Sequence, residues 1–470
     1  MSSPNQPSAA GPGGGIADVL LISAVAATGG VLFGYDTAVV HGTIGALERH
    51  FSADPGRLGF AVASALLGSA VGALLAGRIA DRAGRVRAMR LTAVLFAVSS
   101  VGSGLAESLM SFSSWRFLGG IAVGTASVIA PAYIAEVAPA RIRGRLGSLQ
   151  QLAIVLGIFL ALAVNDLIAH TAGSPDAPFW FGVPAWRWMF WVEAIPSVVY
   201  GLGALFIPES PRYLVAKGRA SEAATVLSRL GEPDVPERIQ DIERTVGAHR
   251  PSRLADLRAA KGVFLPVVWV GIGLSVFQQF VGINVIFYYS TTLWHSVGFT
   301  ESDAMRITTI TGVINIVTTL IAIAFVDRFG RKPLLLVGSF GMAVTLGTMA
   351  WLFAHAPVDA HGSPVLTGAN GTGALIAANL YVFAFGFSWG PIVWVLLGEM
   401  FNNRIRGAAL ALAAAAQWVA NWVVTLTFPG LTHSMGLGFA YGLYTVAAAL
   451  SLILVAVFVK ETRGRELEDM

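Results

Sequence analysis

The sequence predicts an all-α membrane protein, with twelve transmembrane helices in two pseudo-symmetric six-helix bundles and a small cytoplasmic helical domain. Composition is the first reason, because 55% of the 470 residues are hydrophobic and only 12% are charged, which would leave a water-soluble protein with an apolar exterior. Glycine is the second reason. The 53 glycines include the pairs Gly68 and Gly72, and Gly120 and Gly124, a spacing that lets membrane helices pack closely. A duplicated charged motif is the third.

The duplicated motif is a short run of charges around a glycine. It reads Asp-Arg-Ala-Gly-Arg at 81–85 and Asp-Arg-Phe-Gly-Arg at 327–331, slightly more than half of the chain further on. Each copy follows two apolar stretches. Duplicated multi-span halves are a recurring way to build transporters, because two similar bundles can rock about a site between them near the bilayer midplane. The repeat therefore predicts a transporter with its site between the halves.

The predicted spans are apolar stretches, since a helix needs roughly 20 apolar residues to cross the hydrocarbon core. Six of them precede a polar segment that begins near residue 209, and six follow it. Their approximate bounds are 16–40, 58–80, 90–107, 113–137, 147–169, 187–207, 263–290, 307–326, 333–355, 374–398, 406–428 and 437–459.

The basic residues predict the orientation in the membrane. With a cytoplasmic N-terminus, the only Lys or Arg residues outside are Arg49, Arg57, Arg187 and Arg306, and only Arg116 lies within a span. All other basic residues then face the cytoplasm, as the positive-inside rule requires. We therefore expect a multi-pass protein of the plasma (inner) membrane with both termini cytoplasmic.

The chain divides into five predicted segments. The first is rich in Gly, Pro, Ser and Ala and lacks a positive start, which indicates a flexible tail and not a removed signal peptide. The segment between the bundles contains two helix-like stretches, at 220–230 and 236–246, and is either a helical domain or a solvated linker. The segments are a flexible cytoplasmic tail (1–15), an N-terminal bundle (16–208), the cytoplasmic helical linker domain (209–261), a C-terminal bundle (262–460) and a short cytoplasmic tail (461–470).

The repeated charges predict a cytoplasmic gate. Each Asp-Arg-x-Gly-Arg motif lies in a short loop, and a second repeated pair places an acid before an Arg-Gly step at a cytoplasmic helix end. Acids and arginines of neighbouring loops can bridge helices when this side is shut and separate when it opens. The alternative is that these charges only satisfy topology. The predicted gate residues are Asp81, Arg85, Glu136, Arg143, Asp327, Arg331, Glu399 and Arg406.

Three ionisable residues lie within predicted spans, where a charge costs roughly 2.5–3.5 kcal/mol and needs a partner or a role. Asp36 of the first span and Arg116 of the fourth lie at similar depths, and we expect Glu193, near the outer start of the sixth, to share their neighbourhood. These three are the predicted proton-coupling residues. If Asp36 and Arg116 meet, protonation of Asp36 would release the arginine and convert proton binding into a helix rearrangement. The alternative is a static ion pair.

Uncharged polar residues within the spans predict a pocket for a neutral polyol. Amides can both donate to and accept from hydroxyl groups without adding charge, and tryptophan rings offer faces for sugar C–H groups. Some amides can instead join helices, the better reading for Asn421 and for one of two adjacent glutamines. The polar residues are Gln278, Gln279, Asn284, Tyr288 and Tyr289 in the seventh span, with Gln151, Asn315 and Gln417 elsewhere; the tryptophans are Trp389, Trp394, Trp418 and Trp422.

These residues resemble the sugar porters of the major facilitator superfamily over nearly the whole chain, in particular the bacterial xylose/proton and glucose/proton symporters. The resemblance is carried by Gly-Gly-Val-Leu-Phe-Gly-Tyr-Asp at 29–36, Pro-Ala-Tyr-Ile-Ala-Glu at 131–136, Pro-Glu-Ser-Pro-Arg at 208–212, Gln-Gln-Phe-Val-Gly-Ile-Asn at 278–284 and Ser-Trp-Gly-Pro at 388–391, beside the motif at 81–85. In the second half the family's final Pro-Glu-Thr is replaced by Lys460-Glu461-Thr462.

The resemblance implies the major facilitator fold and alternating access around a monosaccharide. It implies that Asp36 binds the proton with Arg116 as partner, and it adds Glu209 and Arg212 to the gate. It places the following residues against the sugar: Gln151, Gln278, Gln279, Asn284, Tyr288, Asn315, Trp394 and Gln417.

The sequence thus predicts proton-coupled import of a monosaccharide of the D-xylose or D-glucose class by a protein that functions as a monomer in the lipid bilayer. A uniporter or exchanger and a nontransporting sugar sensor are the alternatives. No nucleophile–base pair, phosphate loop or metal cluster occurs at a shared depth, and the chain has no cysteine. We therefore expect no enzyme activity, no cofactor, no metal and no nucleic-acid partner.

Overall fold

The structure is a computed structural model of the chain. Within the residues that it describes, almost every segment is helical, and β-structure is limited to isolated bridges at Pro178–Pro184 and Arg258–Phe264. The described residues are 14–139, 142–248, 254–258, 263–288, 290, 293–294, 299–357, 365–366, 368–401 and 405–462.

The first half of the chain forms one bundle. Its helices pack closely where small residues meet a neighbouring backbone: a β-carbon on Gly68 would come within 2.1 Å of the Phe117 carbonyl oxygen, and one on Gly120 within 1.9 Å of the Ala65 carbonyl oxygen. The glycine pairs therefore hold the helix at Pro55–Ala83 against the helix at Leu109–Val137. The elements are α1 (Gly14–Ala38), η1 (Val39–Gly42), α2 (Ile44–Phe51), α3 (Pro55–Ala83), α4 (Arg85–Leu105), α5 (Leu109–Val137), α6 (Arg143–Ala172), η3 (Trp180–Gly182), α7 (Ala185–Val192) and α8 (Ala194–Phe206).

The second half forms another bundle, and a short polar helical segment separates the two. In this segment Leu214, Val215 and Ala223 form a small core of their own. The separating elements are α9 (Pro211–Ala216), α10 (Ala220–Arg229), α11 (Val235–Ala248) and η4 (Leu254–Leu257); those of the second bundle are α12 (Pro266–Phe280), α13 (Ile283–Tyr288), α15 (Glu301–Phe329), α16 (Arg331–Ala354), α17 (Gly368–Gly386), α18 (Trp389–Met400) and α19 (Arg406–Phe458).

Eleven helical stretches of the described chain are long and apolar enough to cross a membrane. The last of them, the 53-residue α19, is interrupted at Gly436 by a non-helical conformation, so it contains two spans. Each of the twelve predicted spans therefore corresponds to one helix or to two consecutive helices, which confirms the all-α membrane fold. The predicted end of the eleventh span at 428 is too early, because the helix continues to the turn at Gly436. Pro429, His433 and Ser434 end the apolar run of the sequence but do not end the helix.

Three pairs of neighbouring spans are joined by a single glycine. Gly84 joins α3 to α4, Gly330 joins α15 to α16, and Gly436 joins the two parts of α19. Their dihedral angles are nearly the same, with φ of 97°, 90° and 83° and ψ of 162°, 167° and 164°. This region of backbone space is essentially closed to other residues, so glycine is required at each turn.

Three spans are interrupted within their length. The sixth breaks at Glu193 between α7 and α8, the seventh at Gly282 between α12 and α13, and the tenth at Ser388 between α17 and α18. Pro196 and Pro391 follow two of the breaks; neither has an N–H to donate to the carbonyl four residues earlier, which weakens the helix at that point. Such breaks are tolerated where they are buried in protein.

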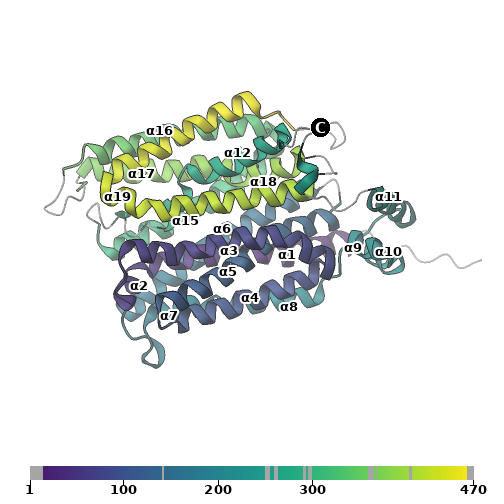
Figure 1. Cartoon of the computed structure of the whole chain (residues 1–470), viewed down its shortest axis with the longest axis horizontal. Helices are drawn as coiled ribbons and strands as arrows, with labels where there is room; N and C mark the ends of the chain where they lie inside the picture. The colour runs from purple at the N-terminus through teal and green to yellow at the C-terminus, as the bar shows by residue number, and fades with distance from the viewer. Residues whose placement is uncertain are drawn as a thin grey trace, which may run out of the picture.

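The two bundles lie side by side with their helices roughly parallel to one long direction (Figure 1). The first half, in purple and blue, contacts the second, in green and yellow, mainly through α3 against α19 and α6 against α15. Helices α9–α11 lie at one end, which we call the linker end, and α2 and α7 lie at the other, the α2 end. The predicted division into domains is consistent with this arrangement and stays a prediction.

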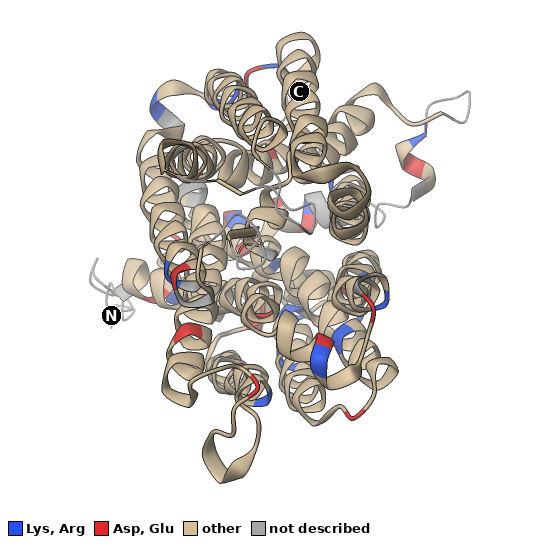
Figure 2. Cartoon of the chain, turned by 90° about the vertical axis from the view of Figure 1, so that its left-hand side faces the viewer, with Lys and Arg blue, Asp and Glu red and all other residues tan. Residues whose placement is uncertain are grey.

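The outward faces of the helices are apolar. Large side chains such as Leu202, Phe206, Phe340 and Val446 are more than half exposed, and the helices seen from the α2 end carry few charges (Figure 2). Lipid is the environment in which such a surface is stable. Of the predicted tails, only 14–15, at the start of α1, and 461–462 lie within the described residues.

Candidate functional site

Three buried charged residues of the first half, Asp36, Arg116 and Glu193, form one group. Asp36 of α1 and Arg116 of α5 are 1% and 2% exposed. The Arg116 Nη1 donates to Asp36 Oδ1 over 2.6 Å, and its Nη2 donates to the Asp36 backbone oxygen over 2.9 Å. The second carboxylate oxygen of Asp36 and the Nε of Arg116 have no hydrogen-bond partner among the described residues. The pair is therefore closely joined but incompletely satisfied.

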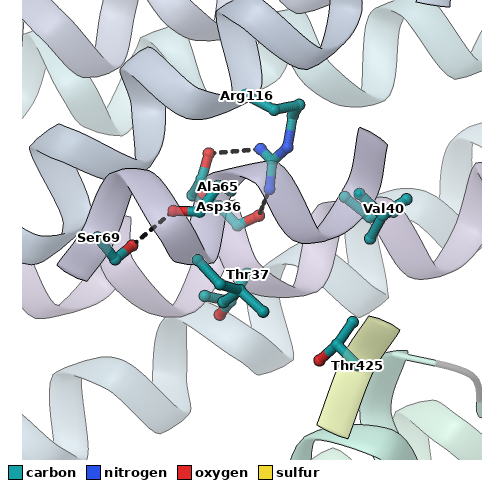
Figure 3. Close-up of a pocket in the computed structure, with 9 residues that line it drawn as sticks. Asp36, Thr37, Val40, Ala65, Ser69, Arg116 and Thr425 are labelled. Atoms are coloured by element: carbon teal, nitrogen blue, oxygen red, sulfur yellow. Dashed lines mark hydrogen bonds and ion pairs between the residues drawn. The ribbon is translucent and has the colours of Figure 1, made fainter. Parts of the chain in front are cut away.

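A small cavity adjoins this pair (Figure 3). Asp36 and Arg116 line it together with Ser69 of α3 from the first half, and Thr425 of α19 lines it from the second half. The cavity thus lies between the two bundles. A change in the charge of Asp36 can therefore affect contacts between the halves as well as within the first one.

Glu193 is the third buried charge. It is 1% exposed, lies at the break between α7 and α8, and neither of its carboxylate oxygens has a hydrogen-bond partner among the described residues. It is near enough to Asp36 and Arg116 to interact with both electrostatically. One arginine therefore faces two carboxylates, and removing two ionised carboxylates from water beside a single cation is unfavourable.

Polar groups gather at the break between α17 and α18. Gln278 of α12 donates through Nε2 to the backbone oxygens of Trp389 and Gly390, over 2.8 and 3.3 Å. Gln151 of α6 lies beside the same turn, because a β-carbon added to Gly390 would be 3.6 Å from its Nε2. Asn315 of α15 also lies beside this break, since a β-carbon on Gly386 would be 3.1 Å from its Oδ1.

The other amide pair lies across the break in the seventh span. Asn284 Nδ2 donates to Gln279 Oε1 over 2.5 Å, across a turn that Gly282 forms with a φ of 81°. A β-carbon on Gly282 would lie 2.7 Å from the ring of Tyr444. Glycine is thus required at 282 because of its positive φ and because a side chain would collide with Tyr444. The turn that it forms brings Gln279 and Asn284 within hydrogen-bond distance.

Several other buried polar atoms have no hydrogen-bond partner in the described part of the chain. They are Gln278 Oε1, Gln417 Oε1 and the indole nitrogens of Trp418 and Trp422. Unpaired buried donors and acceptors are costly, and a neutral ligand with several hydroxyl groups could satisfy them. Of the remaining predicted sugar residues, Trp394 is half-buried in α18, and the side chain of Tyr288 lies outside the described residues.

At the linker end, the first predicted gate cluster centres on Arg85. Its Nε and Nη2 donate to the two oxygens of Glu136, each over 3.0 Å, a two-point geometry that suits arginine and a carboxylate. Glu209 accepts from the backbone N–H of Arg85 over 2.9 Å, which caps the first turn of α4. Asp81 is a weaker partner at 3.5 Å, with its side chain 55% exposed.

The second half repeats this cluster. Arg331 Nε and Nη2 donate to Glu399 over 3.1 and 2.8 Å, and Glu461 accepts from the backbone N–H groups of Arg331 and Lys332 over 3.0 and 2.9 Å. Thr462 Oγ1 donates to Glu399 over 2.6 Å. Glu461 therefore does in the second half what Glu209 does in the first.

Glu461 and Thr462 are site residues that the sequence analysis missed, because it placed them in the C-terminal tail. A signal for them exists: Glu461-Thr462 follows the last span of the second half as Glu209-Ser210 follows the last span of the first. The missing proline before Glu461 concealed the repeat.

The other predicted gate residues are Arg143, Arg212, Asp327 and Arg406, and the structure describes them only in part. Arg406 Nε donates to the Phe401 backbone oxygen over 3.2 Å, and Arg212 is exposed on α9. The side chains of Arg143 and Asp327 lie outside the described residues. Among the residues searched, no group of three His, Cys, Asp or Glu could hold a metal ion.

Comparison with known proteins agrees with this geometry. A family model described as "Sugar (and other) transporter" matches residues 22–470. The chain is 60% identical to a glucose transport protein of Synechocystis sp. (strain ATCC 27184 / PCC 6803 / Kazusa), covering 100% of this chain and 99% of the relative. It is 39% identical to a D-xylose-proton symporter of Escherichia coli (strain K12), covering 96% and 95%.

Solved structures of the major facilitator superfamily are similar to the chain over nearly their whole length. The proton:xylose symporter XylE bound to 6-bromo-6-deoxy-D-glucose matches with a TM-score of 0.84 and 38% identity, over 97% of this chain and 98% of that one. The inward-open conformation of XylE from E. coli matches with a TM-score of 0.77 and 38% identity, over 96% and 98%. The chain therefore belongs to the sugar porter family of the major facilitator superfamily.

Proposed function

We propose that this protein imports a monosaccharide of the D-xylose or D-glucose class across the plasma membrane together with a proton, by alternating access. The observation that carries the proposal is the buried pair of Asp36 and Arg116, which opens on a cavity lined by both halves of the molecule. The family, and the relatives described as a glucose transport protein and a D-xylose-proton symporter, support the substrate class.

In this mechanism the proton binds to Asp36 and breaks its ion pair with Arg116. Protonation of Asp36 removes the charge that holds Arg116, and Arg116 can then turn toward Glu193, whose carboxylate lies nearby without a hydrogen-bond partner among the described residues. This exchange moves α5 relative to α1. Because Thr425 of the second half lines the same cavity, the movement also changes the contact between the bundles.

The sugar binds between the halves in this mechanism. Gln151 comes from the first half, and Gln278, Gln279, Asn284, Tyr288, Asn315, Trp394 and Gln417 come from the second. A polyol that joins Gln151 to the others draws the bundles together, so sugar and proton both favour the same rearrangement. Differential binding of this kind is what couples two ligands to one conformational change.

The charge clusters at the linker end act as the gate. The Arg85–Glu136 and Arg331–Glu399 pairs each hold the end of one helix against the start of another within one bundle. We place this end in the cytoplasm, with both termini there, because the basic residues concentrate on that side. The protein functions as a monomer in the lipid bilayer, since each half already completes the site of the other.

The test is uptake of labelled xylose and glucose into proteoliposomes under an imposed inward proton gradient, with and without a protonophore. One proton crossing 100 mV gains about 2.3 kcal/mol, which supports roughly fifty-fold accumulation. Accumulation above the external level that the protonophore abolishes is the expected result, and the ratio of the two uptakes ranks the sugars. Equilibration without accumulation would instead indicate a uniporter and contradict proton coupling.

A further inference from the structure

One part of the molecule has no role in the proposed function: the connection from α6 to α7. Residues 173–186 form a hairpin, which we call the aromatic hairpin. The Phe179 N–H donates to the Val183 oxygen over 2.9 Å, and the Ala185 N–H donates to the Ala177 oxygen over 3.0 Å. These bonds give the connection a defined shape.

The fold does not require this hairpin. The pseudo-symmetric counterpart of the connection between the fifth and sixth spans is that between the eleventh and twelfth, where Gly436 alone makes the turn. The first half therefore carries more than ten extra residues at a point where the second half needs one. An addition of this kind calls for a role outside the packing of the bundle.

The tip of the hairpin is aromatic and exposed. Phe181 is 91% exposed and Trp180 is 63% exposed, and no charged residue lies between Asp176 and Arg187. Phe181 also has a φ of 56°, a left-handed conformation that is unfavourable for a large side chain. Its ring lies beside that of Trp188, with the centroids 6.3 Å apart, and most of its surface is still open to a partner outside the chain.

The hairpin is also rigid. The rings of Phe179 and Trp180 stack with their centroids 5.3 Å apart and their planes 10° apart, and Trp188 of α7 donates through Nε1 to the Trp180 oxygen over 3.3 Å. At its base, Asp176 forms an ion pair with Arg49 of α2. The tip is therefore held in place before it meets any partner, which lowers the entropy cost of binding.

The position of the hairpin indicates its partner. It lies below α7 at the α2 end and extends sideways, across the direction of the helices (Figure 1), and the view from that end shows it reaching beyond the neighbouring helices (Figure 2). The lipid-facing side of the same span continues from it, through the exposed side chains of Ile195, Val199 and Leu202 on α8. The hairpin thus extends sideways from the bundle at the α2 end, next to apolar outward faces of its helices.

We propose that the aromatic hairpin is a membrane-surface anchor, which inserts Trp180 and Phe181 into the headgroup region of the lipid bilayer at the α2 end. Tryptophan is enriched at this level because its ring has both an apolar body and a polar N–H. The anchor fixes the depth of α7, and Glu193 directly follows the last residue of α7. The lipid therefore helps to hold the helix that positions one member of the buried charge cluster.

The natural absence of cysteine allows a direct test on the full chain. Phe181→Cys carries a nitroxide label in vesicles of phosphatidylcholine and phosphatidylglycerol, and collisions with oxygen and with a water-soluble nickel chelate are measured. Two controls set the scale: Val199→Cys on the lipid face of α8, and Glu48→Cys on the exposed side of α2.

We expect the label at 181 to favour oxygen over the chelate, as at 199. A chelate accessibility as high as that at 48 would overturn the proposal. Trp180→Cys repeats the measurement at the neighbouring position and should give the same result. Dipolar broadening between labels that disappears on dilution with unlabelled protein would show that a second copy of the chain covers the hairpin, and would also overturn it.

Discussion

At the scale of single residues, Asp36 combines strong binding with an unused acceptor. One of its carboxylate oxygens accepts from Arg116, and the other has no hydrogen-bond partner among the described residues. A proton can therefore bind to this second oxygen without first breaking a hydrogen bond. This is the arrangement that a reversible proton site needs.

Asp36→Asn should therefore separate sugar movement from the proton. The amide keeps the shape of the carboxylate but cannot change its charge, so the variant should equilibrate sugar and lose the roughly fifty-fold accumulation that 100 mV supports. Accumulation and counterflow exchange in proteoliposomes measure the two abilities separately. Asp166→Asn on α6 is the matched control and should still accumulate sugar; a D36N protein that does the same would contradict the coupling role.

Gln279 allows a test of the predicted sugar pocket. Its Oε1 accepts from Asn284, so Gln279→Ala removes one amide and leaves the other without its partner. We expect the sugar Kd to rise about tenfold, because a hydrogen bond contributes about 1 kcal/mol and tenfold corresponds to 1.4 kcal/mol. Equilibrium binding of labelled sugar measures the change.

Asn421→Ala is the control for this pocket test. Asn421 Oδ1 accepts from Thr425 one turn further along the same helix, which fits the structural role predicted for it. Its removal should lower the Tm and leave the sugar Kd unchanged. An unaltered Kd in Q279A would place Gln279 in the structural group with Asn421.

At the scale of elements, two carboxylates cap corresponding helices in the two halves. Glu209 accepts from the first N–H groups of α4 and Glu461 from those of α16. Negative charge at a helix N-terminus is favourable, since it satisfies free N–H groups and the helix dipole. The second cap comes from the end of the chain, so it ties the residues after the last span to the rest of its bundle.

Glu461→Gln should destabilise the second bundle by about 1–2 kcal/mol, since hydrogen bonds to charged groups are among the stronger ones. Thermal unfolding in detergent should show a lower Tm than for the unchanged protein. Lys460→Gln alters the neighbouring exposed residue and should have no such effect. Equal Tm values for both variants would show that the cap does not stabilise the bundle.

The spans could be predicted from the sequence, but the breaks within them could not. Apolar length indicates where a helix crosses the membrane, whereas a break depends on where the backbone hydrogen bonds are interrupted. Pro391 is a partial signal for the break at Ser388, and Pro196 for that at Glu193. A proline can also be accommodated with only a kink, as Pro131 is inside α5, so the residue type alone does not decide.

The same limit applies to the site. The depths of Asp36 and Arg116 could be matched by counting along the spans, and the structure brings them into contact. That Arg85 would pair with Glu136, and that Glu461 would cap α16, depends on how the short loops fold. Spacing along the chain does not contain that information, although comparison of the two halves would have pointed to Glu461.

At the scale of the whole molecule, the two bundles meet along α3 with α19 and along α6 with α15. If the halves rock during transport, contacts near the ends of these helices must open and close. A β-carbon on Gly59 of α3 would be 4.0 Å from Pro429 of α19, near the α2 end. The two halves are therefore close enough at this position for a short cross-link.

A link between cysteines at 59 and 429 should therefore stop transport. Gly59→Cys and Pro429→Cys together, joined by a short cleavable thiol reagent, should lose nearly all uptake and regain it when the link is cut. Each single variant treated with the same reagent should keep its activity. Full uptake with the link intact would show that the bundles need not separate at this end.

Gly436, which joins the two parts of α19, has a backbone conformation that suits a D-amino acid. At Gly436 a β-carbon would meet nothing within 4 Å, so a lack of space is not what excludes alanine there; the handedness of the amino acid is. The backbone angles at this turn are close to the mirror image of an ordinary extended residue. A D-alanine placed at 436 by chemical ligation should therefore be accepted where L-alanine is rejected, and the turn would distinguish the two enantiomers of a single methyl group.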